Sequence, residues 1–579
     1  MNKAFGIGVG GVVLLSRAFT PAAMAACSNT APPSNTTVGC SGTSIPAVTA
    51  QAGSTGVAIN VDATASGSFV HATNPVAFSV DTSSTITSSG NLSLTGGGGS
   101  GTARGAVLLG INNNSQVTNA AAGVINTTGA FNDGMAANGS GNTLTNKGSI
   151  TTNGPNAYGM TAAWGQTNSG QLSNTLINTG SVSTSGSNAR AASILGGSGV
   201  VNNGGTLSTT GASSTTVYLQ GNNDQLINSG TITASGSGSD AVFSNTAGSS
   251  FTATIQNLAG GQIISQNAAG IRTLNGNSTV INAGLVQSNA GTAISMGNGN
   301  DSLILQTGSI ITGRADGGAG SNTVTLQGTG TASNVFTNFQ TLLMQGTLWN
   351  WTGSGTFALA HVQTGTLNLT GTLGATASAV VDTGATLQAN AQNLPQNVTD
   401  NGLVRFAQDN AGTYSGLIAG AGAVEKSGAG TLTLAPATAG GNTYAGGTNI
   451  DQGVLAAGAD NALGASAGGI TFNGGALQLT QSFDLASTRA VTLNASGGTI
   501  DTQSFASTLA QPVTGVGALT KAGAGSLLMT GISTYSGGTT VAAGTLAVGD
   551  ASTPGAALGG GGAVTVASGA TLGGYGSVT

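Results

Sequence analysis

Two stretches near the C-terminus of the chain repeat one pattern. The first reads Gly420-Ala-Gly-Ala-Val-Glu-Lys426-Ser-Gly428-Ala-Gly-Thr-Leu-Thr-Leu434, then Tyr444-Ala-Gly-Gly-Thr448, then Gly453-Val-Leu. The second reads Gly515-Val-Gly-Ala-Leu-Thr-Lys521-Ala-Gly523-Ala-Gly-Ser-Leu-Leu-Met529, then Tyr535-Ser-Gly-Gly-Thr539, then Gly544-Thr-Leu. A long pattern that recurs with its lysine, tyrosine and glycine pairs in register indicates a repeat architecture.

A looser repeat, Asn-x-Gly-x-apolar, precedes this pattern. Its copies begin 25 to 32 residues apart, at Asn119, Asn146, Asn178, Asn203, Asn228, Asn257 and Asn282, two of them in longer variants. That spacing suits one coil of a parallel β-helix, in which three short strands are joined by turns. We expect glycine to supply turn angles that other residues avoid. We also expect the stacked asparagines to hydrogen-bond from coil to coil.

The composition favours an all-β solenoid. Charged residues make up 5% of the 579 residues, against roughly 25% in an ordinary soluble domain. No apolar run approaches the length of about 20 residues that a membrane helix needs, and Val, Ile and Thr alternate with small polar residues as in half-buried strands. The net charge of −5 gives nucleic-acid binding no electrostatic basis.

The N-terminus predicts export. Residues 1–25 are typical of a signal peptide, with Lys3, a short apolar core and the small-x-small site Ala23-Met-Ala25. Cys27 and Cys40, which follow at once, predict a small disulfide loop in an oxidising compartment. The alternative is a lipidation box that ends at Cys27, which would leave Cys40 unpaired.

The C-terminal pattern resembles the autotransporter-associated β-strand repeat of Gram-negative passenger domains. The shared motifs are G-x-G-x-L-x-K-x-G-x-G-x-L-x-L, T-Y-x-G-G-T and G-x-L, and residues 299–330 and 569–574 are similar to such passengers as well. The resemblance implies a right-handed parallel β-helix, like that of pertactin. It also implies type V secretion and display by a C-terminal outer-membrane β-barrel. We expect the chain to be truncated before that barrel.

These observations predict four regions. They are a signal peptide at 1–25; an N-terminal cap at 26–110 with the Cys27/Cys40 loop; a β-helix with Asn-x-Gly repeats at 111–330; and a β-helix with autotransporter-associated repeats at 331–579. Residues 85–115, which run from the cap into the first coils, include a run of four glycines. We expect an irregular binding tip there.

Three motifs approach known chemical sites. Asp382-Thr-Gly384 resembles the strip of aspartic proteases, but Ala567 stands in the aspartate position of a matching copy, which indicates a turn pattern. Asn300-Asp301-Ser-Leu303 resembles an esterase block without its glycine. Residues 317–324 approach a calcium-binding nonapeptide, with Asn322 in place of Asp.

The remaining candidates are few. We expect His71 and His361 to be surface or turn residues. Trp349 and Trp351 are expected to pack around a coil corner, or else to form an exposed pair that contacts sugar or protein. The sequence therefore predicts no catalytic site, no cofactor and no metal.

We expect a passenger that acts as an adhesin or autoaggregation stalk, displayed at the cell surface or secreted, and non-catalytic. Its partners would be a host or bacterial cell surface or a second copy of itself, with the outer membrane reached through the missing barrel. Two alternatives stay open: a passenger-borne hydrolase, either esterase or protease, whose catalytic part is not evident, or a ligand-free structural spacer.

Overall fold

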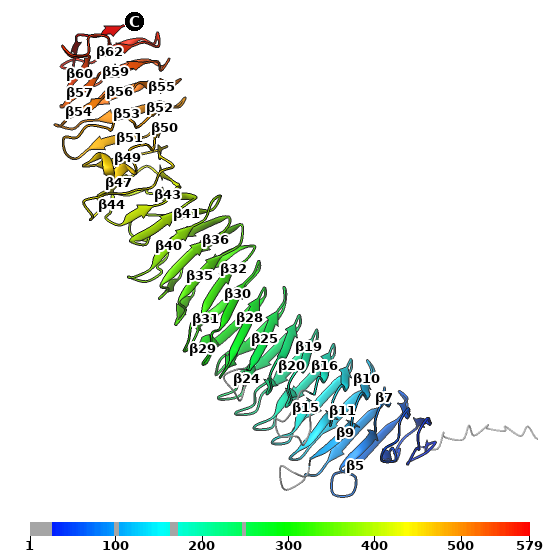
Figure 1. Cartoon of the computed structure of the whole chain (residues 1–579). Coiled ribbons are helices and arrows are strands. Elements are labelled where there is room, and N and C mark those ends of the chain that lie inside the picture. Colours follow the sequence, from blue (N-terminus) through cyan, green and yellow to red (C-terminus); the bar gives the residue numbers. More distant parts are fainter. Residues whose placement is uncertain (1–25, 98–103, 163–171, 246–250) are drawn as a thin grey trace, which may run out of the picture.

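The computed structural model describes residues 26–97, 104–162, 172–245 and 251–579, and these form one long rod (Figure 1). The expected signal peptide lies outside the described residues. The predicted all-β solenoid is confirmed: parallel strands stack coil upon coil, and the one helix among the described residues is the short 3₁₀ helix η1 (Asp460–Leu463). The coil is therefore the unit of the structure.

Each coil of the N-terminal half has three strands on three faces. The first-face strands are β7 (Thr85–Ser88), β10 (Gln116–Asn119), β13 (Thr143–Asn146), β16 (Thr175–Asn178), β19 (Val200–Asn203), β22 (Asp224–Asn228), β25 (Thr252–Asn257) and β28 (Asn277–Asn282). The second-face strands are β8 (Asn91–Thr95), β11 (Val124–Thr127), β14 (Ser149–Thr152), β17 (Ser181–Thr184), β20 (Thr206–Thr209), β23 (Thr231–Ala234) and β26 (Gln262–Ser265). The third-face strands are β9 (Gly105–Gly110), β12 (Asn132–Ala137), β15 (Tyr158–Ala162), β18 (Arg190–Ile194), β21 (Val217–Leu219), β24 (Val242–Ser244) and β27 (Ile271–Thr273).

The second and third faces belong to one 21-stranded sheet. They are joined because β29 (Leu285–Ser295) turns the corner and pairs with both β26 and β27. The first face continues toward the C-terminus through β30 (Ser302–Leu305), β32 (Thr323–Leu326), β35 (Thr341–Met344), β38 (Leu359–Val362), β40 (Ser378–Val381), β42 (Asn397–Asp400) and β45 (Leu417–Ala419).

The core is a column of apolar side chains along the rod axis. Alternate strand residues point inward, so Leu176, Val201 and Leu226 stack in register and are almost fully buried. Burial of one such side chain is worth about 1.5–3 kcal/mol. One continuous cluster extends from Val38 to Leu558, so every coil contributes to a single core.

Trp349 and Trp351, on β36 (Leu348–Trp351), are fully buried in this column. Trp351 packs against Phe336 and Phe357, with ring centroids 4.8 and 5.3 Å apart. The indole nitrogens donate to backbone carbonyls at 3.3 and 3.2 Å. The tryptophans are therefore core residues, and the alternative of an exposed aromatic pair is wrong.

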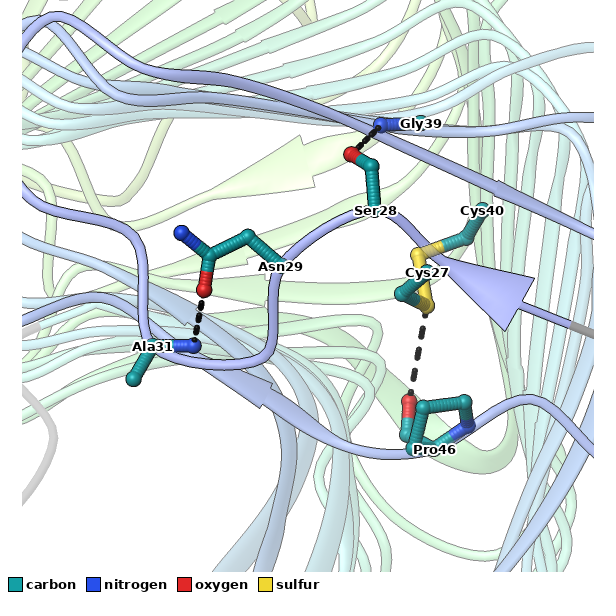
Figure 2. The surroundings of a disulfide bond; sticks show 7 residues. All are labelled: Cys27, Ser28, Asn29, Ala31, Gly39, Cys40 and Pro46. Carbon is teal, nitrogen blue, oxygen red and sulfur yellow. Dashed lines mark hydrogen bonds between the residues drawn. A yellow bond between two sulfur atoms is a disulfide. The ribbon is translucent and has the colours of Figure 1, made fainter.

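The N-terminal end of the rod is closed by a short antiparallel strand. β1 (Ala26–Cys27) pairs with β2 (Thr37–Ser41), and a disulfide joins Cys27 to Cys40 (Figure 2). β1 covers the edge of β2, which would otherwise expose unpaired backbone groups. Parallel stacking begins at once, with β2 on β4 (Ala58–Val61). The coils thus start well before residue 111. Regular strands occupy 15 of the 25 described residues of 85–115, where an irregular tip was expected; residues 98–103 lie outside the described residues.

Seven buried asparagines form a hydrogen-bonded row at the corner between the first and second faces. The Nδ2 of each of the first six donates to the Oδ1 of the asparagine in the next coil at 2.8–2.9 Å, and the Nδ2 groups also lie near turn carbonyls of their own and the next coil. The row, called the asparagine ladder below, consists of Asn119, Asn146, Asn178, Asn203, Asn228, Asn257 and Asn282. The expectation of coil-to-coil asparagine bonds is confirmed.

The glycine of the Asn-x-Gly motif serves a purpose that was not expected. Gly205 does not adopt a positive φ; a Cβ there would lie 2.1 Å from the carbonyl oxygen of Gly180 in the preceding coil. Gly180 and Gly230 meet the same obstacle, at 2.0 and 2.1 Å. Close backbone stacking therefore requires these glycines. At the next corner, left-handed angles come instead from Phe131, Asn156, Asn188, Ser213 and Gly238.

A second polar column stands at the corner between the third and first faces. Each of its side chains accepts the backbone N–H at the same position one coil earlier: Asn142 from Ser115 (2.8 Å) and Asp224 from Gly199 (2.9 Å) are examples. Asp301 accepts likewise from Ser278 at 2.7 Å. Burial raises the pKa of Asp224 to about 7 and the pKa of Asp301 to about 6.

The lysine and tyrosine of the C-terminal repeats are interior residues. Lys426, on β46 (Ala423–Ser427), is fully buried, and its Nζ donates to the carbonyls of Ser427, Gly428 and Gln452 at 2.6–3.0 Å. Lys521, on β56 (Leu519–Ala522), makes the equivalent bonds to Ala522, Gly523 and Ala543. The two repeat tyrosines bond their own motif threonines, Tyr444 to Thr448 at 2.8 Å and Tyr535 to Thr539 at 2.6 Å. The lysine and the tyrosine of each repeat therefore hydrogen-bond the turns from inside the coil. These hydrogen-bonded groups are called turn clamps below.

Arg489 clamps the one helical turn onto the coil below it. Its Nε and Nη2 each lie 2.9 Å from the Asp460 carboxylate, and Nη1 donates to the carbonyls of Leu463 and Gly468. The guanidinium is fully buried. An ion pair so buried requires such complete hydrogen bonding, since desolvation otherwise outweighs the attraction.

Candidate functional site

The most distinctive outer surface of the rod lies on the third face of the N-terminal half. The chain has few arginines and few aromatic residues, yet three arginines and four aromatic rings meet there. We name this set the arginine–aromatic stripe; it consists of Arg104, Phe131, Tyr158, Arg190, Tyr218, Phe243 and Arg272.

Strand register builds the stripe. Tyr158 lies opposite Arg190 on the next coil, and Phe243 lies between Tyr218 and Arg272 in the same way. Tyr218 and Phe243 pack edge to face, with centroids 5.6 Å apart. Residues 25 or more positions apart in sequence thus become neighbours because each coil adds one member.

Guanidinium groups lie over the aromatic rings along the stripe. Arg104 is 4.1 Å from the Tyr158 ring centroid, Arg190 is 3.4 Å from that of Tyr218, and Arg272 is 4.2 Å from that of Phe243. The ring quadrupole attracts a cation in this position. The stripe is therefore a cross-coil row in which two aromatic rings separate successive arginines.

Each end of the stripe is neutralised by a buried aspartate. Arg104 contacts Asp133 at 2.6 and 3.0 Å, and on balance this carboxylate raises the pKa of Arg104 against the opposing effect of burial. Arg272 pairs with Asp240 at 2.5 Å. Burial raises the pKa of Asp240, although Arg272 acts in the opposite direction.

The middle arginine differs from the two at the ends. Arg190 donates from Nη1 to Ser193 Oγ at 3.2 Å. Of the six arginines in the described residues, the other five pair with an aspartate or glutamate and Arg190 alone does not. Burial lowers the pKa of Arg190. The stripe thus holds one cation without a counter-charge.

The motifs that approach enzyme sites prove to be structural. His361 Nε2 lies 3.0 Å from Asp382 Oδ2, in a half-exposed pair at the coil surface. Asp301 and Asn322 are buried members of the second polar column, and Asn322 Nδ2 donates to the carbonyl of Asn338 at 2.9 Å. His71 lies in a turn, which is one of its two expected positions, but it is buried there, 2.6 Å from Asn132 Oδ1.

Other sites for chemistry are not apparent in the described part of the chain. It contains no cluster of three or more His, Cys, Asp or Glu side chains that could hold a metal ion. Two surface grooves of about 350 and 380 Å³, at residues 372–396 and 433–481, are lined by uncharged residues only and offer hydrogen bonds but no acid, base or histidine. A third groove of about 380 Å³, at residues 482–528, has Asp484 as its one charged lining residue.

The stripe was not predictable from the sequence. Its members follow no common motif, and their partners are defined by coil length, which varies from coil to coil. A weak signal existed: aromatic residues and arginine recur shortly before or within the apolar triplet that follows each Asn-x-Gly motif, as at Tyr158, Arg190 and Tyr218. Without knowledge of the strand register, these residues could not be aligned with one another.

Comparison with known proteins supplies a family signal at the C-terminal repeats. The family model described as passenger-associated-transport-repeat matches residues 424–457 and 519–548. The chain carries autotransporter passenger repeats. The matched segments contain the buried clamps formed by Lys426, Tyr444, Lys521 and Tyr535, so the passenger-repeat motif encodes turn stability.

A curated relative is the adhesin BmaC autotransporter of Brucella suis biovar 1 (strain 1330). It is 33% identical to the passenger-repeat chain over 143 residues, which is 25% of this chain and 4% of that protein. The aligned segment therefore spans a small part of the relative. No solved structure matches the chain. No helix in the described residues is long and apolar enough to cross a membrane.

Proposed function

We propose that this rod is an exported passenger, displayed at the cell surface or secreted, which acts as an adhesin or autoaggregation stalk and not as an enzyme. The single observation that carries the proposal is the uninterrupted stack of coils, which presents a long outer surface with a concentrated arginine–aromatic stripe. Its mechanism is presentation: stacked strands hold surface side chains in fixed register for contact with another surface.

Two further observations support this proposal. The similar Brucella protein is named an adhesin. The low charge of the chain leaves little repulsion between rods that approach each other. The proposed partners are a host or bacterial cell surface, or a second copy of the rod, with the outer membrane as its anchor.

The test is adhesion by the purified chain. Beads coated with the chain are mixed with epithelial cells, with bacteria, or with each other, and albumin-coated beads serve as the control. Binding to cells above the control supports an adhesin, and clustering of coated beads supports autoaggregation. If the chain causes neither, the proposal is wrong and a ligand-free spacer explains the rod; hydrolysis of ester or peptide substrates would instead show an enzyme.

A further inference from the structure

The second face is interrupted near the middle of the rod, between β31 (Ile310–Asp316) and β33 (Thr329–Ala332) (Figure 1). Its strands are paired coil upon coil from β8 to β31, and again from β33 to β46. Within the described residues no backbone ladder joins β33 to β31. The other two faces are continuous here, since β30 pairs with β32 on the first face and β31 pairs with β34 (Val335–Thr337) on the third. The break therefore opens one side of the coil stack and leaves the other two sides joined.

A change in the outline of the coil accounts for the break. β31 curves without interruption from the second face to the third, whereas the next coil turns sharply at Ser333 and Asn334, between β33 and β34. The coils also become shorter. Leu326 and Met344, which are partners on the first face, are 18 residues apart, against 25 to 32 in the asparagine ladder. Coils of different outline do not keep all three faces in register, and the second face is the one that loses its ladder.

Side chains replace part of the missing ladder. Asn334 Nδ2 donates to the carbonyl oxygens of Ile311 and Gly313 at 2.7 and 2.9 Å. The Thr329 N–H donates to Thr307 Oγ1 at 3.0 Å. Side chains turn about their own bonds, so these contacts open more readily than a ladder between two backbones.

The core is also thinner on this side of the rod. Ile311, the inward residue of β31, is only partly buried. Gly330, the inward residue of β33, has no side chain, and a Cβ there would lie 2.6 Å from the Trp349 ring of the next coil. The asparagine ladder ends one coil earlier, where Asn282 donates to Ser309 Oγ at 2.7 Å. Few buried apolar contacts and few ladder hydrogen bonds are the features of a region that opens locally.

We propose that this break is a hinge, at which the rod bends by opening between β31 and β33. The paired strands of the first and third faces hold the two coils together while the second face opens. Elsewhere on that face the same bend would break a backbone ladder. The hinge tilts the N-terminal half, which carries the arginine–aromatic stripe, against the half that carries the passenger repeats. The inference does not depend on the adhesin function, since it concerns the shape of the rod alone.

Distances between pairs of spin labels measure the bend. Thr231→Cys with Thr366→Cys places two labels on the second face, six coils apart and on opposite sides of the break. The matched control is Ser149→Cys with Ile310→Cys, which are also six coils apart but lie on one side of it. In a straight rod either pair is about 29 Å apart. The native cysteines are joined in a disulfide and do not take up the label.

The two pairs should give different distance distributions. The control pair should give one narrow distance. The pair across the break should give a distribution at least about twice as wide, which extends to longer distances because the labels lie on the side that opens. Equal widths would overturn the hinge, and a spread toward shorter distances alone would overturn opening on the second face.

Electron microscopy of the unmodified chain is a test that no substitution can disturb. Negatively stained rods should bend through varying angles at one point near the middle. Rods that are all straight, that share one fixed angle, or that curve evenly along their length would each overturn the hinge.

A change at Asn334 tests the contacts that close the break. Asn334→Ala removes the bonds to the Ile311 and Gly313 carbonyls, so the long-distance part of the spin-label distribution should grow about twofold or more. The control is Asn350→Ala, which removes a side chain that accepts from Asn368 Nδ2 at 2.9 Å within the paired coils. It should leave the distribution unchanged. Equal effects of the two changes would show that the break is no weaker than the rest of the rod and would overturn the hinge.

Discussion

The buried lysine of each passenger repeat stabilises a turn that no apolar residue could. Lys426 satisfies three backbone carbonyls inside the coil. We predict that Lys426→Met lowers the free energy of unfolding by about 3 kcal/mol or more, because buried acceptors lose their donor. Urea denaturation and hydrogen exchange of residues 423–457 measure this. The exposed Lys147 is the control: Lys147→Met should change little, and equal effects would contradict the clamp.

Asp224 predicts how stability depends on pH. Its pKa is raised by burial to about 7, from 3.8, so the folded chain binds this proton more tightly than the unfolded chain. The unfolding free energy therefore rises as pH falls from about 8 through 7, and the gain is complete near pH 4, for a total on the order of 2–4 kcal/mol. The raised pKa of Asp301 and of Asp400, each about 6, acts in the same direction.

Thermal melts of the wild type and Asp224→Asn between pH 8 and 4 check the sign. The variant cannot ionise, so it should be more stable than the wild type at pH 8 and show a smaller dependence on pH. Asparagine already occupies this column at Asn142 and Asn174, where the side-chain amide also donates to a carbonyl. Identical pH dependence in both proteins would show that Asp224 is not the titrating group.

Single residues were predictable from sequence only where the repeat itself defined them. The ladder asparagines were predictable, because their regular spacing in the sequence indicated that they stack in successive coils. His71 and the two tryptophans were not settled, because whether a side chain points inward depends on its place in a strand and on the phase of the coil. Arg190 could not be singled out from the sequence, since an unpaired charge is recognised only when its neighbours are known.

The turn after the asparagine ladder offers a direct comparison of adjacent glycines. A Cβ on Gly205 would meet the Gly180 carbonyl oxygen at 2.1 Å, whereas a Cβ on Gly204 has its nearest contact at 3.6 Å. We predict that Gly205→Ala lowers the unfolding free energy by about 1–3 kcal/mol or more. Gly204→Ala should be close to neutral. Denaturation midpoints of the two variants decide, and equal midpoints would contradict close coil stacking as the reason for the motif.

The asparagine ladder can be extended by one coil. Ser88 lies opposite Asn119 and precedes Gly90 with the motif spacing, and within the described residues neither Ser88 Oγ nor Asn119 Oδ1 has a hydrogen-bond partner. Ser88→Asn would place an Nδ2 donor beneath that oxygen. We predict a gain of about 1 kcal/mol, seen as slower hydrogen exchange in β7 and β10. Ser89→Asn, one residue away in the same turn, should give no gain; a loss of stability in Ser88→Asn would show that the corner lacks room.

At the scale of the rod, stability should be local. Each coil contacts only its neighbours, so the molecule is close to one-dimensional and its stability is a sum over coils and interfaces. We predict that a chain ending at residue 346 keeps the native exchange pattern in β7 to β28. Hydrogen exchange of the shortened and full chains tests this, and loss of protection throughout the remaining coils would show a single cooperative unit.

The rod as a whole was predictable because repetition specifies it many times over. Each Asn-x-Gly copy indicates the same coil, so errors in one copy do not alter the conclusion. The start of the coils was placed too late, because the coils before residue 111 carry Val61 or Ser88 in place of the ladder asparagine. The face that carries the stripe was not predictable, since it emerges only when coils of unequal length are stacked.

The side-chain amide dipoles of the asparagine ladder all point in one direction along the rod. Every amide in it points the same way, with oxygens toward Asn119 and N–H groups toward Asn282, whose Nδ2 ends on Ser309 Oγ at 2.7 Å. Strand dipoles largely cancel within a sheet, so the ladder's dipoles add without opposition, as peptide dipoles do in an α-helix. Hydrogen bonds in such a chain polarise one another. The ladder therefore has a negative end at Asn119 and a positive end at Asn282, and a break at its middle would weaken the hydrogen bonds beside it.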